Sequence, residues 1–224
     1  MNVIGDAHGV SKISVSRTNH LIAKNIAENI GLYIQFPMTN TERQSVMFNF
    51  YDIKEFPPVL GEVDGTLIPI KAPSIDEHLY VCRRGFRALN VQGVCDVSNL
   101  FTNIVAHYAG STHDAHIWNN WKLSEAFKSG VINNGCLLGD SGYGLKPWLL
   151  TQVLNSSAAA ERKYNKAHKS TRCAIERTFG IWKMRFRCIY RVLTFTPKRS
   201  PRFLCRPTAF CSTCWSRGTS DRFP

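Results

Sequence analysis

The sequence predicts an α/β protein in which a mixed sheet is flanked by helices. Segments rich in β-branched and aromatic residues come first, at residues 59–70, 86–95 and 100–108, and the loop at 96–99 joins the last two as a hairpin. Helical stripes then alternate with a further short strand, which is typical of helices packed on the faces of such a sheet. Because 44% of the 224 residues are hydrophobic, the chain can bury a core of this size.

Residues 1–35 are predicted to form part of a helix-turn-helix. Gly9 gives the backbone freedom for a turn, and Ser11 is a preferred helix cap. Apolar residues then recur at roughly helical spacing as far as Ile30. A glycine turn before a helix rich in Ser, Lys and Arg fits a DNA-binding helix-turn-helix, although an ordinary helical hairpin is the commoner alternative. The candidate DNA-binding residues here are Ser11, Lys12, Ser14 and Arg17.

Three further elements are predicted beyond this region. Residues 36–58 are predicted to be a linker with a short amphipathic helix, which Pro57 and Pro58 end. A helical stripe over 113–128 precedes a short buried strand at 136–138. A final helix is predicted from about residue 171 to 188, because apolar residues recur there every three or four positions.

Positive charge is concentrated at the end of the chain. The formal net charge is +12, and ten Lys and Arg against one Asp place nine of these charges from Lys183 onward. Such a segment fits a polyanion such as nucleic acid, and Lys183, Arg185 and Arg187 are candidate contacts. A solvated basic tail without a partner is the alternative. We expect no membrane span, because no apolar run approaches roughly 18 residues, and no secretory signal, which indicates the cytosol or nucleus.

Four carboxylates occupy unusual places in this pattern. Asp64 and Asp140 each follow an apolar run and precede glycine or a Ser-Gly pair, Asp114 opens a predicted helix, and Glu176 follows a core-facing Ile175. Buried carboxylates need a cation or hydrogen-bond donors. A divalent ion such as Mg²⁺ or Mn²⁺, which prefers oxygen ligands, would reconcile several of them at one site. The alternatives are ordinary, because Asp also forms turns and caps helices.

These carboxylates lie in an ordered series of motifs. The motifs are Val63-Asp64-Gly65-Thr66, Gly110-Ser111-Thr112-His113-Asp114, Leu138-Gly139-Asp140-Ser141-Gly142-Tyr143, Asn165-Lys166-Ala167-His168 and Ile175-Glu176-Arg177-Thr178-Phe179-Gly180. The four acids are separated by 50, 26 and 36 residues. The series resembles the PIF/Harbinger DDE transposases, and among them the Harbinger transposase-derived nucleases of animals. The resemblance covers roughly residues 1–199.

The resemblance implies a ribonuclease H-like catalytic domain over residues 59–199 that cleaves DNA with a divalent metal cation, Mg²⁺ or Mn²⁺. Asp64, Asp140 and Glu176 would be the catalytic triad, and Asp114 a fourth metal ligand. The family also implies DNA as the partner, a second protein with a Myb-like DNA-binding domain, and a location in the nucleus as well as the cytoplasm.

Two departures from the family pattern favour a second hypothesis. The chain begins within the DNA-binding helices, and residues 200–224 lack the apolar helix that the family has there. We interpret this tail as aberrant, through a frameshift, an altered exon or a gene-model error near residue 199. The alternative function is therefore a catalytically silent DNA-binding or adaptor protein derived from a transposase.

Overall fold

A five-stranded mixed sheet forms the centre of the protein in a computed structural model that describes residues 9–54 and 58–190. The strands are β1 (Val59–Pro69), β2 (Ala88–Cys95), β3 (Phe101–Ala109), β4 (Cys136–Leu138) and β5 (Leu149–Leu150), in the order β3-β2-β1-β4-β5. The β1–β2 and β2–β3 pairs are antiparallel, whereas β1–β4 and β4–β5 are parallel. The predicted α/β class, a ribonuclease H-like mixed sheet flanked by helices, is confirmed.

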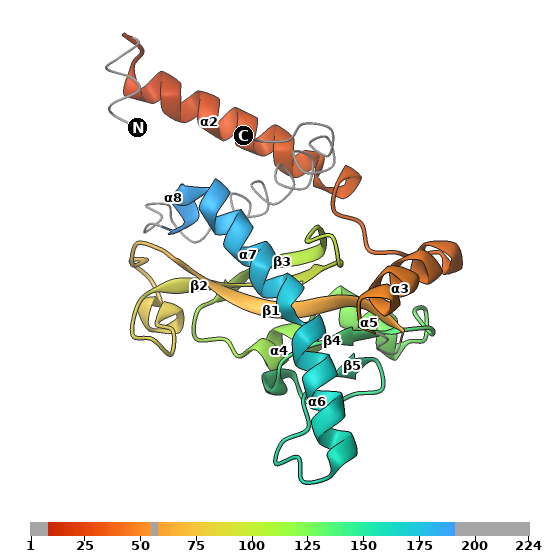
Figure 1. Ribbon diagram of the computed structural model, residues 1–224. Coiled ribbons are helices and arrows are strands. Elements are labelled where there is room, and N and C mark those ends of the chain that lie inside the picture. The colour runs from red at the N-terminus through yellow and green to blue at the C-terminus, as the bar shows by residue number, and fades with distance from the viewer. Residues whose placement is uncertain (1–8, 55–57, 191–224) are drawn as a thin grey trace, which may run out of the picture.

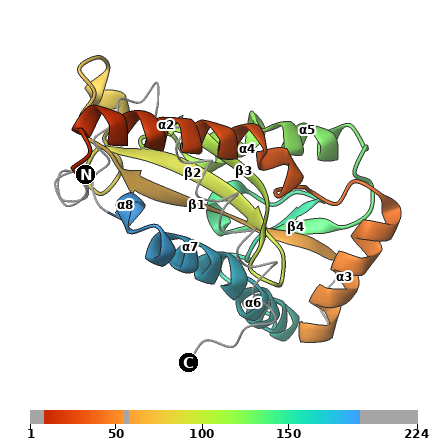
Figure 2. The same cartoon turned by 90° about the horizontal axis from the view of Figure 1, so that it is seen from above.

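Helices cover both faces of this sheet. They are α2 (Lys12–Glu28), α3 (Asn40–Lys54), α4 (Asp114–Asn119), α5 (Lys122–Lys128), α6 (Ala159–Thr171), α7 (Cys173–Arg185) and α8 (Arg187–Tyr190), with short 3-10 turns η1 (Ile30–Leu32), η2 (Glu77–Tyr80) and η3 (Ser141–Tyr143). Figure 2 shows α4 and α5 on one side of the sheet and α6 and α7 on the other. Two cores result, because alternate strand residues face opposite sides.

The core beneath α7 positions that helix on the sheet. Ile175, Phe179 and Trp182 are buried against β1, β2 and β3, and Trp182 lies edge-on to Phe101 with ring centroids 6.1 Å apart. On the opposite face Trp118 of α4 packs with Leu60 and other buried residues. The periodicity that predicted the final helix therefore identifies its buried face correctly.

Two predicted helices differ from the structure in their bounds. The stripe over 113–128 divides into α4 and α5, because Trp121 adopts an extended backbone between them. The final helix ends at Arg185, since Phe186 leaves the helical conformation before α8. Helix α6 was not predicted, because its sequence is mostly polar and its few apolar side chains, such as Tyr164, pack only on the edge of the core.

The N-terminal region agrees in part with its prediction. Gly9 has a φ of +63°, and the Ser11 hydroxyl accepts a 3.1 Å hydrogen bond from the Ser14 amide, so the predicted turn and cap are confirmed. One continuous helix, α2, follows, and Figure 1 shows it apart from the sheet. The helix that would precede it falls in residues 1–8, outside the described residues.

Helix α3 confirms the helix predicted within residues 36–58. Thr39 and Glu42 cap its first turn reciprocally, since the Glu42 carboxylate accepts from the Thr39 amide at 3.0 Å and the Thr39 hydroxyl accepts from the Glu42 amide at 3.2 Å. Phe50 anchors the helix in the core. Within the described part of the chain, no helix has the length and apolar character needed to cross a membrane.

Candidate active site

The candidate site lies where β1 and β4 diverge. The parallel pairing of these strands ends at Glu62 and Leu138. Asp64 comes two residues beyond that point on β1, and Asp140 comes two residues beyond β4. Glu176 is in the first turn of α7, which Figure 1 shows running across β1. Three elements that are distant in sequence therefore bring the predicted triad to the region where β4 ends beside the middle of β1.

Asp64 is a largely buried carboxylate. Its side chain is 19% exposed, and its Oδ1 accepts a 2.8 Å hydrogen bond from the Gly65 amide. Burial raises the pKa of Asp64 to about 6, and Arg172 and the Gly65 amide act in the opposite direction. The charges of Asp140 and Asp114 also raise this pKa, which shows that both carboxylates lie near enough to interact with Asp64.

Arg172 connects Asp64 to Glu176. Its Nη2 lies 3.0 Å from Glu176 Oε1 and 3.9 Å from Asp64 Oδ2. The Arg172 side chain is 17% exposed, whereas that of Glu176 is 62% exposed. The guanidinium therefore stands between a buried carboxylate on the sheet and a solvent-facing carboxylate on α7.

Glu62 fixes the start of α7 against the sheet. Its side chain is fully buried, and its Oε2 accepts a 2.9 Å hydrogen bond from the Ile175 amide. Burial raises the pKa of Glu62 to about 8, although hydrogen bonds from the Ile175 and Ala174 amides oppose the shift. The carboxyl group satisfies amides that a helix start leaves without partners. Because Glu62 and Asp64 are on the same strand, this contact also sets the position of Glu176 relative to Asp64.

Asp140 forms a turn near the other acids. Its Oδ1 accepts a 2.9 Å hydrogen bond from the Gly142 amide, so the ordinary turn-forming role of this Asp is present. The turn brings Tyr143 into the core, where its ring lies edge-on to Trp118. Burial first, and then the charges of Asp114, Asp64 and Asp140, raise the pKa of Tyr143 well above its usual value. All three Asp carboxylates therefore lie near enough to this tyrosine for their charges to act on its pKa.

Asp114 is held by amide side chains of β2. Its Oδ1 accepts from Asn90 Nδ2 at 2.8 Å and from Gln92 Nε2 at 3.3 Å. A small cavity of about 90 Å³ opens beside it, lined in part by the Gly110–His113 motif. A Cβ atom on Gly65 would lie 2.5 Å from Asp114 Oδ1. Because successive strand residues face opposite sides, Asp114 approaches β1 from the face opposite to Asp64.

Replacing Gly65 with alanine is therefore expected to displace Asp114. The new methyl group cannot occupy the same space as the carboxylate, and such overpacking costs about 1–3 kcal/mol of stability. Urea unfolding should show that loss as a lower unfolding free energy. Gly180→Ala is the matched control, because a Cβ there meets no atom within 4 Å. Wild-type stability of Gly65→Ala would contradict the close approach of the Asp114 carboxylate to residue 65.

The predicted DNA-binding residues fall into two groups. Lys183 is half-buried, and its Nζ donates to Thr66 Oγ1 at 2.6 Å and to the Leu67 carbonyl at 3.3 Å. This contact joins α7 to β1, and burial lowers the pKa of Lys183. Arg185 and Arg187 are exposed at the end of α7 and the start of α8. The basic residues after 190 lie outside the described residues.

The other candidates are at the start of α2. Ser11 and Ser14 hydrogen-bond to one another as part of the helix cap, and Arg17 is exposed one turn further along. Lys12 is the first residue of the helix. These residues belong to a helix that is separate from the carboxylate site in sequence and, in Figure 1, in space.

The carboxylates suit a divalent cation in their chemistry. Asp and Glu oxygens are the ligands that Mg²⁺ and Mn²⁺ prefer, and Asp64 is a largely buried carboxylate whose pKa is raised by that burial. Among residues 9–54 and 58–190, no three His, Cys, Asp or Glu side chains gather closely enough to hold one ion. Between Asp64 and Glu176, the Arg172 guanidinium stands where a cation would.

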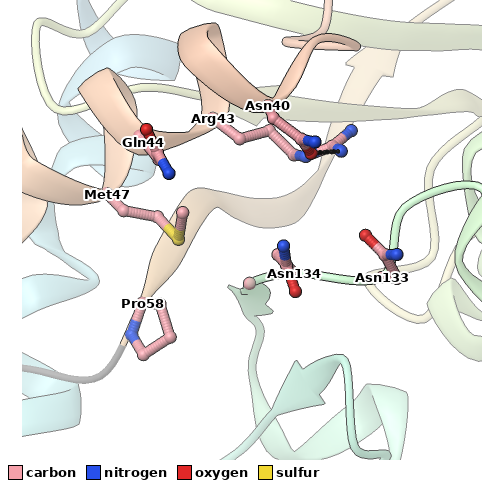
Figure 3. A pocket seen from close by; sticks show the side chains of 8 residues that line it. Asn40, Arg43, Gln44, Met47, Pro58, Asn133 and Asn134 are labelled. Carbon is pink, nitrogen blue, oxygen red and sulfur yellow. Dashed lines mark hydrogen bonds between the residues drawn. The ribbon is translucent and has the colours of Figure 1, made fainter.

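A roomier pocket lies away from these acids. It has a volume of about 300 Å³ and is formed by α3 and the loop before β4 (Figure 3). Its lining includes Arg43, whose guanidinium donates to the Met38 carbonyl at 2.8 Å and to Asn40 Oδ1 at 2.5 Å. None of the four candidate carboxylates lines it, so the site chemistry and the larger pocket do not coincide.

Comparison with known proteins places this arrangement in a family. Residues 63–212 match the model of the DDE superfamily endonuclease domain. The chain belongs to that family. It is 33% identical over 204 residues to the human protein named "Putative nuclease HARBI1", covering 90% of this chain and 58% of the human one. The mouse protein of that name is 35% identical over 186 residues, covering 83% of this chain and 53% of the mouse one.

A plant protein is also similar to this chain, at a lower sequence identity. The Arabidopsis thaliana "Protein ALP1-like" is 25% identical over 221 residues, covering 91% of this chain and 54% of that protein. The chain thus spans between half and three-fifths of the length of these relatives. No solved structure matches it.

Four residues of the site were not among those predicted from sequence. Arg172 could have been found from the sequence, because it is four residues before Glu176, the spacing at which opposite charges pair on a helix. Asn90 and Gln92 could also have been found, since two polar residues at a spacing of two interrupt an otherwise apolar strand. Glu62 had only its position inside an apolar run, which does not reveal its partner on α7.

Proposed function

We propose that the protein is a transposase-derived DNA endonuclease that hydrolyses phosphodiester bonds with divalent metal ions. The observation that carries the proposal is that Asp64 and Glu176, from β1 and α7, share one cationic partner at the point where β1 and β4 diverge. Asp140 lies close enough to raise the pKa of Asp64. Membership of the DDE superfamily endonuclease family supports the same reaction.

Asp64, Asp140 and Glu176 would hold the metal, whereas Asp114, which approaches β1 from the opposite face, would support the site from the other side of that strand. Two divalent ions in such a site supply an activated water and stabilise the leaving oxygen of an in-line displacement. The chain itself supplies the framework: Glu62 fixes α7 to β1, and the Asp140 turn keeps that carboxylate at the end of β4. Asn90 and Gln92 orient Asp114.

DNA contacts are proposed at two places outside this centre. Arg185, the last residue of α7, and Arg187, the first residue of α8, are exposed at the end of α7 opposite to Glu176, and they offer charge to a phosphate backbone. Residues 1–35, with α2, are proposed as a separate DNA-binding region, residues 36–58 as its linker, and residues 59–199 as the nuclease domain. A nuclear location and a Myb-like partner protein are parts of the same proposal.

The second candidate function is a DNA-binding or adaptor protein without catalysis. It is favoured by one observation, that the described carboxylates do not gather into a group of three around one ion site. The two functions differ in their response to metal. A nuclease needs divalent ions to cut, whereas a binding protein retains DNA in EDTA and loses it as salt rises.

Supercoiled plasmid incubated with the purified chain tests the proposal. We expect nicked and linear products with Mg²⁺ or Mn²⁺ and none with EDTA, because the carboxylates have no catalytic role without an ion. Gel shift in EDTA over a range of salt concentrations measures DNA binding in the same preparation. Salt-sensitive binding with no cleavage under any metal condition would establish the second function instead.

A further inference from the structure

A buried arginine lines the pocket of about 300 Å³ between α3 and the loop before β4 (Figure 3). Arg43 is only 4% exposed, and its guanidinium donates to the Met38 carbonyl and to Asn40 Oδ1. Its Nε is buried and has no hydrogen-bond partner among the described residues. The guanidinium thus retains an unused donor at the wall of the pocket.

The charge of Arg43 has no carboxylate counterpart in the part of the chain that the structure describes. No Asp or Glu oxygen there lies within 4.0 Å of its guanidinium. The neighbouring Glu42 carboxylate is committed to the start of α3, because its Oε2 accepts from the Met38 and Thr39 amides. Burying an arginine without an anionic partner is costly, since neutral acceptors replace only part of its hydration. The wall of the pocket therefore favours an anion.

The other groups that line the pocket are neutral. Four primary amides, a thioether, a proline ring and a glycine make up the rest of the wall: Asn40, Gln44, Asn133, Asn134, Met47, Pro58 and Gly135. Figure 3 shows the side chains of α3 on one side of the space and Asn133 and Asn134 on the other. An amide side chain carries one donor group and one acceptor, as a peptide unit does. The wall therefore combines a single positive charge with amide groups that match a polypeptide backbone.

These features favour a carboxylate on a peptide over a nucleic-acid phosphate. A carboxylate ends a slender side chain and accepts from a guanidinium in its own plane, so it can reach a recessed arginine. A phosphodiester lies between two sugars, and surfaces that bind a nucleic-acid backbone present several exposed Lys or Arg side chains. Among the described lining residues Arg43 is the one cation, and it is buried.

We propose that this pocket binds an acidic side chain of a partner polypeptide, with the carboxylate on the Arg43 guanidinium and the backbone of the partner on the Asn and Gln amides. The formal net charge of +12 favours the approach of an acidic partner. The pocket is separate from the proposed nuclease centre, because none of the four candidate carboxylates lines it. Binding here therefore needs neither DNA nor a metal ion.

Titration with N-acetylglutamate N-methylamide, a capped glutamate, tests the proposal. In nitrogen-labelled protein the Arg43 Nε–Hε signal, assigned by its loss in Arg43→Lys, should shift as this compound is added. We expect a Kd of about 1 mM, a modest affinity for a ligand of this size. The capped glutamine, which has nearly the same shape without the charge, should bind at least about tenfold more weakly. Equal binding of the two compounds, or an unshifted signal at tens of millimolar capped glutamate, would overturn the proposal.

A charge placed at the pocket tests the same contact without altering Arg43. Asn133→Asp adds a carboxylate at an exposed residue of the lining, and it should weaken binding of the capped glutamate about tenfold through repulsion. Asn25→Asp is the matched control, because it adds the same charge at an exposed position of α2, outside the pocket. Unchanged affinity of folded Asn133→Asp would contradict the proposal. Acetate that binds as tightly as the capped glutamate would also contradict it, since the amides would then contribute nothing.

Discussion

Asp64→Asn is expected to reduce plasmid cleavage by about three orders of magnitude or more, the largest effect predicted for a single side chain. Asparagine has nearly the same shape and can still accept the Gly65 hydrogen bond, so the fold is retained. It lacks the negative charge that a metal ligand on β1 needs. Asp140→Asn should have a similar effect, and the double variant should be little worse than either, because the residues act as a unit.

Asp96→Asn is the matched control for this prediction. Asp96 is a partly buried Asp whose pKa is also raised by burial, and its Oδ1 accepts from the Leu100 amide at 2.8 Å in the β2–β3 loop. The Asp96→Asn substitution removes one partly buried carboxylate next to β2 and leaves the four candidate site carboxylates unchanged. Cleavage that persists in purified Asp64→Asn would trace the activity to a contaminant or to a different centre.

The second large effect is expected from replacing Glu62, which should lower the free energy of unfolding. Glu62→Ala removes the acceptor of the Ile175 amide and opens a cavity in the core, which together should cost about 2–4 kcal/mol of unfolding free energy. Glu62→Gln keeps an oxygen for that amide and should stay within about 1 kcal/mol of the wild type at pH 6. Urea unfolding in EDTA measures both variants without any contribution from metal.

The pH dependence of the same variants follows from the raised pKa of Glu62. This pKa is about 8 in the folded protein and 4.5 as the ordinary value, so the folded state holds a proton that the unfolded state releases between these limits. The contribution of Glu62 to the free energy of unfolding is thus greatest below about pH 4.5, and this contribution is lost as the pH rises toward 8. Glu62→Gln should flatten that decline and exceed the wild type in stability at pH 8.5.

Glu125→Gln is the control for these curves, because Glu125 is an exposed glutamate on α5. Its pH profile should coincide with that of the wild type. If Glu62→Gln also follows the wild-type profile, Glu62 is ionised at neutral pH in the folded protein and another group carries the dependence. Asp64 is the next candidate, since burial raises its pKa in the same direction.

Much of the fold could be predicted because its signals are local. The apolar runs of β1, β2 and β3, the Ser11 cap and the stripe of α7 each involve residues close in sequence, and all were found in the structure. Helix α6 was missed because its sequence is mostly polar, and the few side chains that it buries pack at the edge of the core with residues of α3. The break between α4 and α5 was missed because apolar residues continue through Trp121, which is buried in a non-helical conformation.

The candidate site also has a part that the sequence predicts and a part that only the tertiary contacts show. The sequence by itself predicted which acids would carry the chemistry, because Asp64, Asp114, Asp140 and Glu176 stand in short motifs whose order and spacing can be compared with those of a family. Only the tertiary structure showed what each acid contacts. Asn90 and Gln92 hold Asp114, Glu62 anchors α7, and Arg172 pairs Asp64 with Glu176. These contacts join residues up to 113 positions apart, and the register of β1 against α7, on which they depend, is set by the packed core and not by any local motif.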